Sequence, residues 1–342
     1  MGITAEAVLP ASRAWWEAGD QFHRASLRGR LATAYARAAI WTLGRLSRSD
    51  IRDPAFDWEK GRRAVSTVER PVARLAAGVR RERAGNAPVP AEWFVPGAGE
   101  VPTEAEGPCV LYVHGGSYCL DRTRLHDALA SHVASNSGLP VLAVDYRLAP
   151  EHPYPAGLED VLASWDWLRQ FRAAEEVAFL GDSAGAGLAL AALLRLRDAE
   201  APLPAAYVAL CPWADLTFSG ASIIDNADTD AFMSDIEIIS GFAELYLQGT
   251  SAYESCASPA LAELGGLPDT LIHAGSHDML ADDARRIAAS MRRGGGRVRL
   301  ELWTHMPHVW QRLGDLVPES RQSLRAIGAF LHSRLVLEER AA

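Results

Sequence analysis

The sequence has few cysteines, no long hydrophobic run and no spacing typical of metal ligands. Its four cysteines, Cys109, Cys119, Cys211 and Cys256, are far apart in a chain of 342 residues. We therefore expect reduced thiols without disulfides, and neither a metal nor a cofactor. The longest apolar run, Leu188–Leu194, is far shorter than the ~20 residues that a membrane-spanning helix needs.

Positive charge is also in short supply. The chain has 34 Lys and Arg against 43 Asp and Glu, a formal net charge of −9 at pH 7. This balance disfavours nucleic acid or an anionic membrane surface as the main partner. The N-terminus lacks the cationic start and apolar core of a secretory signal. With 49% hydrophobic residues the chain can bury a large core, and we expect a cytoplasmic protein without stable membrane insertion.

A glycine-flanked serine lies near the middle of the chain, in the run VAFLGDSAGAGLALAALL at 177–194. The apolar stretch before it and the Ala/Leu stretch after it predict a strand, a sharp turn and a helix. A serine at such a turn projects from the sheet on a strained backbone, and small residues two positions to either side let strand and helix pass closely. Ser183 is therefore the candidate nucleophile. The alternative is a glycine-rich turn whose Ser or Asp caps the helix.

A nucleophilic serine needs a base to take its proton and a third group to hold that base. In a strand–turn–helix fold of this type the order is Ser, then Asp or Glu, then His. Asp278 follows a predicted strand at 270–274 and is the candidate acid; otherwise it would be a helix-capping or surface carboxylate. Asp282 and Asp283 are rivals, but we expect them on the solvated first turn of the next helix.

Two histidines, His305 and His308, share the loop after a predicted strand at 298–304. We favour His308 as the base because it lies just before an apolar turn that can begin the next helix. The histidines expected to be structural are His114, His273 and His277.

A glycine-rich loop, HGGSY at 114–118, follows another predicted strand. Its backbone N–H groups can approach a substrate oxygen because glycine has no side chain in the way. Acyl transfer needs such donors for the oxyanion of its tetrahedral intermediate, and each good donor is worth ~3 kcal/mol. The candidate oxyanion-hole residues are Gly115, Gly116 and Ser117, with the N–H of Ala184. The alternative is a loop that only turns the chain.

From residue 91 onward, short apolar runs alternate with helical stretches. Strands are predicted at 92–95, 109–114, 141–145, 177–181, 207–211, 270–274 and 298–304, and helices at 122–136, 156–173, 184–199 and 281–293. This alternation predicts an α/β fold, a mostly parallel central sheet with helices on both faces. Ligands of such sheets bind at the carboxyl ends of the strands.

Two segments interrupt the alternation. Residues 1–85 have a helical pattern, including a second helix at 65–83, and residues 215–258 contain a predicted helix at 232–247. We expect both to form a helical cap, which gives an N-terminal cap segment at 1–85 and a catalytic domain at 86–342 with a cap insertion at about 215–258. The first segment's apolar residues can line a pocket or, more simply, pack against the main domain. They are Trp15, Trp16, Phe22, Leu27, Leu31, Tyr35, Ala38 and Trp41.

Taken together, the motifs resemble those of the hormone-sensitive-lipase-like family of α/β-hydrolase carboxylesterases. The matching motifs are HGGSY at 114–118, VDYRLAPEHPYPAGLED at 144–160, GDSAG at 181–185 and the contexts of Asp278 and His308. The resemblance covers residues 90–335 and implies the α/β-hydrolase fold. It implies Ser183 as nucleophile, His308 as general base and acid, and Asp278 as the group that orients His308.

The same resemblance implies that Gly116, Ser117 and Ala184 supply the oxyanion N–H groups, while Gly115 keeps the loop tight. It implies that His114 and the Asp-Tyr-Arg block at 145–147 brace that loop. Ser117 stands where the family has a third glycine, and its side chain is expected to narrow the pocket. The insertion reads DTDAFMS in place of the family's proline-containing pattern, so details of the family's cap are not transferred.

These observations predict a serine carboxylesterase that hydrolyses short to medium acyl esters of small hydrophobic compounds through an acyl-enzyme intermediate. A lactonase, an amidase or an acyltransferase of a biosynthetic pathway would use the same site. A non-catalytic binding protein is the alternative of another class, as with the plant gibberellin receptors, but those receptors lack the catalytic histidine. The resemblance also makes a homodimer through the last strand or helix of the sheet an arrangement to consider.

Overall fold

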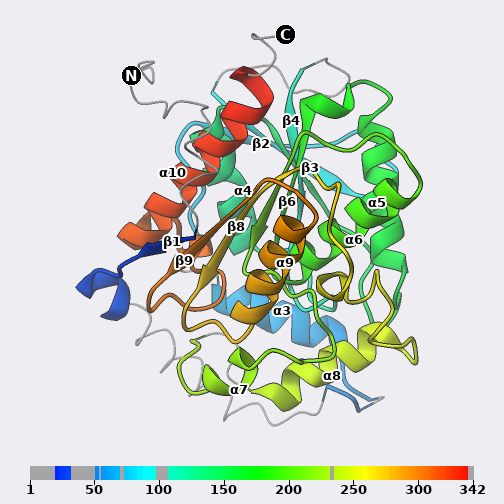
Figure 1. Cartoon of the computed structure of the whole chain (residues 1–342), viewed down its shortest axis with the longest axis vertical. Coiled ribbons are helices and arrows are strands. Elements are labelled where there is room, and N and C mark those ends of the chain that lie inside the picture. Colours follow the sequence, from blue (N-terminus) through cyan, green and yellow to red (C-terminus); the bar gives the residue numbers. More distant parts are fainter. Residues whose placement is uncertain are drawn as a thin grey trace.

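A computed structural model of the chain describes most residues between positions 20 and 337. The described residues are 20–31, 51–53, 55–69, 73–97, 107–231 and 235–337. Within them, nine strands form one sheet in the order β1-β9-β8-β7-β6-β4-β5-β3-β2 (Figure 1). The strands are β1 (Gln21–His23), β2 (Val79–Arg83), β3 (Ala91–Pro96), β4 (Cys109–Val113), β5 (Val141–Val144), β6 (Val177–Asp182), β7 (Ala206–Leu210), β8 (Asp269–Gly275) and β9 (Val298–Trp303).

The sheet is mostly parallel, as predicted. All neighbouring pairs from β1 to β5 are parallel, and β3 runs antiparallel to both β5 and β2. The seven predicted strands are present with ends that differ by at most one residue. None of the helices in the described stretches is long and apolar enough to cross a membrane.

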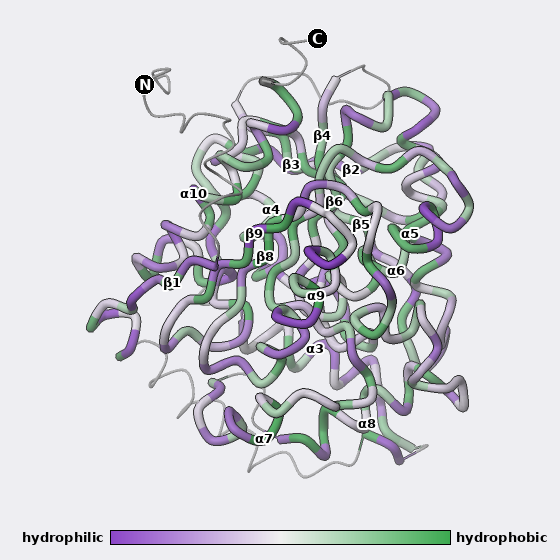
Figure 2. The backbone as a smooth tube through the Cα atoms, viewed as in Figure 1, coloured by the Kyte–Doolittle hydropathy of each residue, from purple (hydrophilic) through white to green (hydrophobic). Residues whose placement is uncertain are grey.

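Both faces of the sheet are covered, because successive residues of each central strand point to opposite sides. On β4, Leu111 and Val113 join one core while Val110 and Tyr112 join the other. Hydrophobic residues accordingly follow the central strands in Figure 2. The first core is covered by α5 (Ala156–Leu168), α6 (Ala184–Asp198) and α9 (Ala281–Arg293), and the second by α4 (Arg124–Ser137) and α10 (Pro318–His332).

The prediction of helices alone in the N-terminal segment is wrong in two places. The helix expected at 65–83 is α3 (Trp58–Glu69), and the residues at 79–83 form β2 instead. Arg81 of β2 bonds to Glu92 of β3 (2.9 Å) and to Asp127 of α4 (2.9 Å). These long-range ion pairs convert an arginine-rich stretch, VRRER, into an edge strand.

The second error concerns β1, which pairs in parallel with β9 and extends the sheet at its far edge. His23 stacks on Trp303, and its Nε2 lies 3.0 Å from Oε2 of the buried Glu301, so contacts with distant residues hold the strand. Phe22 and Leu27 are 69% and 72% exposed, which contradicts their expected packing against the main domain. The expected aromatic residues outside the described stretches are Trp15, Trp16, Tyr35 and Trp41.

Three helices gather at one end of the molecule, beyond the sheet (Figure 1). They are α3, α7 (Ser222–Asp225) and α8 (Ile236–Leu247). The helix predicted at 232–247 is α8, and its first residues, 232–234, lie outside the described stretches. Trp58 of α3 meets Phe242 of α8 with ring centroids 6.2 Å apart. The N-terminal segment and the insertion are therefore in direct contact.

Candidate active site

Ser183 lies at the sharp turn between β6 and α6. Its φ of 54° and ψ of −125° are unusual for a residue with a side chain, as expected of a serine held on a strained turn. The flanking glycines are required by close backbone approaches. A Cβ at Gly181 would lie 2.6 Å from the backbone of Ala186, and a Cβ at Gly185 would collide with the Val113 carbonyl oxygen. The spacing of the motif thus follows from how β4, β6 and α6 meet.

The structure brings Ser183, His308 and Asp278 together. The Ser183 hydroxyl lies 2.8 Å from Nε2 of His308, and Nδ1 of His308 lies 3.0 Å from Oδ1 of Asp278. Each residue follows the carboxyl end of a different strand, β6, β9 and β8 respectively. All three side chains are buried. Because a carboxylate only accepts, Nδ1 of His308 carries the proton and Nε2 is the atom left to accept from the serine.

The charges around His308 favour its protonated form. Burial lowers the pKa of the imidazole, but the carboxylates of Asp278 and Asp230 outweigh burial and the opposing charge of Arg312, so the net pKa lies above the ordinary value. An imidazole with a raised pKa is a stronger base toward a serine proton.

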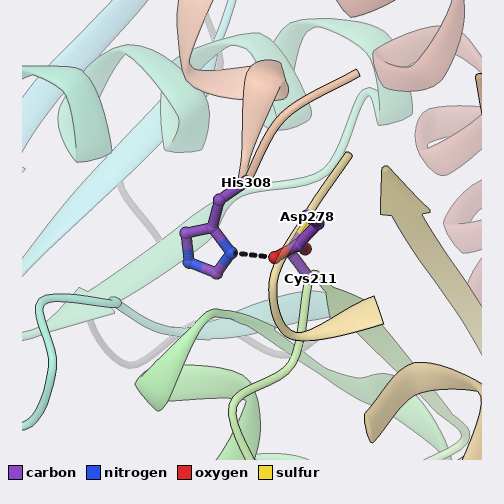
Figure 3. A group of neighbouring side chains, drawn as sticks. All are labelled: Cys211, Asp278 and His308. Atoms are coloured by element: carbon purple, nitrogen blue, oxygen red, sulfur yellow. Dashed lines mark hydrogen bonds and ion pairs between the residues drawn. The ribbon is translucent and has the colours of Figure 1, made fainter. Parts of the chain in front are cut away.

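Cys211 lies beside Asp278, which is hydrogen-bonded to His308 (Figure 3). Ligand atoms of Cys211, Asp278 and His308 all lie within 4.8 Å of one another, which is close enough to consider a metal ion. However, the His308 nitrogen and an Asp278 oxygen are hydrogen-bonded to each other. A metal would have to replace that hydrogen bond, so this cluster is better described as a hydrogen-bonded His–Asp pair with a neighbouring thiol.

The glycine-rich loop passes next to the serine turn. The Gly115 N–H donates to Oδ1 of Asp182 (3.0 Å), so Gly115 holds the loop and its own N–H is engaged. The described stretches contain no acceptor for the N–H groups of Gly116, Ser117 and Ala184. Gly116 has φ 125° and Ser117 φ 54°, which explains why glycine suits both positions. These three N–H groups are those left available to a substrate oxygen.

Asp182, directly before Ser183, was not singled out from the sequence. It is fully buried and accepts from the Tyr112 hydroxyl (2.6 Å) and from Arg312 Nε (3.0 Å), besides Gly115. It thereby links the serine turn to the glycine loop and to the segment after His308. Its place inside the GDSAG motif was the available signal.

His114 supports the same loop through its contacts with Tyr146. Its ring stacks on Tyr146, whose hydroxyl donates to the His114 carbonyl oxygen (2.8 Å). Burial lowers the pKa of His114 to about 4, so its imidazole is neutral. A neutral, stacked ring fits a supporting role and not proton transfer.

The rival residues lie elsewhere. His305 is exposed and pairs with His277 (3.1 Å), and His273 bonds to Ser323 (2.7 Å) behind the site. We expected Asp283 on a solvated turn, but it is buried, and its carboxylate accepts a hydrogen bond from the Ala214 N–H (2.8 Å). Local sequence could not show this, because the covering segment comes from 69 residues earlier. Burial raises the pKa of Asp283 to about 8.

Comparisons with known proteins define the class first. Residues 110–312 match the family described as alpha/beta hydrolase fold. An acetyl-hydrolase of Streptomyces hygroscopicus is 40% identical over 272 residues, 76% of this chain and 89% of the relative. The carboxylesterase NlhH of Mycobacterium tuberculosis is 32% identical over 241 residues, 66% of this chain and 75% of the relative. The fold and these relatives are those of serine hydrolases.

Solved structures narrow the class further. An esterase from the bacterial hormone-sensitive lipase family superposes with a TM-score of 0.79 at 36% identity, covering 91% of this chain and 99% of the other. The esterase EstE5, soaked with p-nitrophenyl butyrate, superposes with a TM-score of 0.79 at 30% identity over the same shares. The chain belongs to the α/β-hydrolase family and, within it, to the bacterial hormone-sensitive-lipase group of carboxylesterases.

Proposed function

We propose that the chain hydrolyses short to medium acyl esters of small hydrophobic compounds through a Ser183-His308-Asp278 triad and an acyl-enzyme intermediate. The observation that carries this proposal is the continuous hydrogen-bonded series from serine to imidazole to carboxylate. Two relatives bear the name acetyl-hydrolase, which supports the short end of the acyl range.

In the proposed mechanism, Nε2 of His308 takes the Ser183 proton as the serine oxygen attacks the ester carbonyl carbon. Asp278 holds the imidazole in the required tautomer and stabilises the imidazolium. The oxyanion accepts hydrogen bonds from Gly116, Ser117 and Ala184 N–H groups. His308 then protonates the leaving alcohol. In the second half, water attacks the acyl-enzyme with His308 as base, and the acid departs as Ser183 recovers its proton.

We also propose that the N-terminal segment and the insertion form the cap over this site. The contact between Trp58 and Phe242 supports a single cap assembled from both segments. Arg62 of α3 donates to the carbonyl oxygens of Cys119 (2.8 Å) and Ala149 (3.0 Å), which anchors the cap next to the glycine loop.

A cytoplasmic location, a homodimer and the absence of a nucleic-acid partner stay predictions from the sequence. The edge of β9 that faces away from β8 is already paired with β1. A homodimer through that edge of β9 would therefore require β1 to leave the sheet.

The test is initial-rate measurement on p-nitrophenyl esters from acetate to laurate with wild type, Ser183→Ala and the exposed matched control Ser251→Ala. We expect turnover that is highest for the shorter esters, loss of at least about 10³-fold in Ser183→Ala, and no change in the control. Stoichiometric labelling of Ser183 by a phosphonate is the second expected result.

Full activity of Ser183→Ala would refute the triad. Labelling of Ser183 without ester turnover would instead favour a lactone or an amide as the natural substrate, or an acyl acceptor other than water. Neither labelling nor turnover would favour a binding protein.

A further inference from the structure

A buried carboxylate of the insertion, Asp230, reaches two loops: the acid loop, which follows β8 and carries Asp278, and the base loop, which follows β9 and carries His308. Its side chain is fully buried, and Oδ2 accepts the N–H of Met279, the residue after Asp278, at 3.0 Å. Oδ1 accepts the backbone N–H of His308 at 3.4 Å. One side chain therefore fixes the backbone next to Asp278 and that of His308 itself.

Further bonds join the insertion to the acid loop. The Asn226 side-chain amide donates to the carbonyl oxygen of Asp278 (2.7 Å), and the Ser222 hydroxyl donates to the carbonyl oxygen of Met279 (2.8 Å). One stretch of the insertion thus holds Met279 through both its N–H and its carbonyl oxygen, and Asp278 through its carbonyl oxygen. A segment that only roofed a pocket would not need these bonds.

Burying a carboxylate costs free energy of folding unless the carboxylate is hydrogen-bonded. At a buried position that has no functional role, an apolar residue would be the more stable choice. Asp230 accepts from two backbone N–H groups, and its carboxylate lies close enough to His308 to raise the pKa of the imidazole. The titratable and charged groups that face His308 from the surrounding segments are Asp278, Asp230, Arg312, Cys211 and Ser183.

We propose that Asp230 is a positioning residue for the esterase reaction: it locks the acid loop and the base loop in one register and thereby makes the insertion part of the catalytic apparatus. Asp230 does not touch the substrate or the reacting atoms, and it acts through the backbone of Met279 and His308 and through its charge. The inference rests on the proposed roles of His308 and Asp278.

The experiment compares Asp230→Asn with the matched control Asp228→Asn, an exposed aspartate two residues earlier in the same segment. The asparagine has the same shape but can accept through only one atom, so one of the two backbone bonds is lost together with the charge. We expect kcat on p-nitrophenyl acetate to fall about tenfold to 100-fold with KM nearly unchanged. The acidic limb of the kcat/KM profile should move to lower pH, because His308 loses a charge that favours its protonated form. The control should match wild type in both.

The expected results are separable from those that test the triad. If Ser183→Ala is inactive while Asp230→Asn is folded, with wild-type kcat and an unmoved acidic limb, the positioning role is refuted and the triad stands. A loss of kcat without a pH shift would also refute the electrostatic part. Should Asp230→Asn melt far below wild type, Asp230→Glu, which keeps the charge, serves as the second variant. We expect it to keep the wild-type acidic limb, and a shifted limb there would overturn the proposal.

Discussion

Replacing Gly115 by alanine tests whether the glycine loop supplies the oxyanion donors. An alanine Cβ at this position would lie 2.7 Å from the carbonyl oxygen of Asp182 and 2.6 Å from Nη2 of Arg312. Van der Waals contact between carbon and oxygen begins at about 3.4 Å. The new Cβ and the Asp182 carbonyl oxygen must therefore move apart by more than about half an ångström. The question is which side moves.

The serine turn is the less mobile partner. Asp182 pairs with Leu210 in the sheet, and the N–H of Ser183 donates to the Leu210 carbonyl oxygen (2.9 Å). The glycine loop must therefore shift away, and it carries the N–H groups of Gly116 and Ser117. Loss of one oxyanion donor costs about 3 kcal/mol in the transition state, which is about 100-fold in kcat.

Steady-state kinetics of Gly115→Ala on p-nitrophenyl acetate measure this effect. We expect kcat to fall about 100-fold with little change in KM, because the donors act mainly on the transition state. Gly85→Ala is the matched control, since a Cβ there meets nothing within 4 Å. A folded Gly115→Ala enzyme with kcat within about threefold of wild type would refute the assignment of the oxyanion hole to this loop.

Two further predictions follow from the other buried carboxylates. Asp278→Asn should lower kcat by about 10³-fold to 10⁴-fold, because its amide forces the wrong His308 tautomer; near-normal turnover would argue that another group orients the imidazole. Asp283→Asn should stabilise the protein increasingly as pH rises. The raised pKa of about 8 means that the folded state favours the protonated carboxyl. The free energy of unfolding of the wild type therefore declines as the pH rises from the unfolded-state pKa of about 4 to the folded-state pKa of about 8. Thermal unfolding at about pH 5 and about pH 9 should show an advantage of the variant that grows by a few kcal/mol; an equal difference at both would contradict the burial of a neutral Asp283.

Much of the fold followed from local pattern. The central strands are apolar because both faces are buried, and that makes each a short hydrophobic run that is visible in the sequence. Ser183, Asp278 and His308 could be placed together because the carboxyl ends of neighbouring parallel strands meet at one edge. The edge strands could not be foreseen, since β2 reads VRRER and becomes a strand only through partners such as Glu92.

The buried aspartates show a different limit of sequence reasoning. Asp230 and Asp283 have the composition of solvated loop or helix-end residues, and nothing in their neighbours indicates burial. Their environment is made by segments 49 and 69 residues away, which bring backbone N–H groups to the carboxylates. A pattern that reports local periodicity carries no information about such donors.

Three buried carboxylates thus connect parts of the site that the chain keeps far apart. Asp182 joins the serine turn to the glycine loop, Asp278 holds the imidazole, and Asp230 ties the insertion to the acid and base loops. Each buried charge is costly, and each is compensated by donors that would otherwise be free to move. Unpaired donors at a reacting centre must be oriented before the reaction, and holding them rigid in advance lowers the barrier. The energetic cost of burying these aspartates is therefore best understood as the cost of a preorganised site.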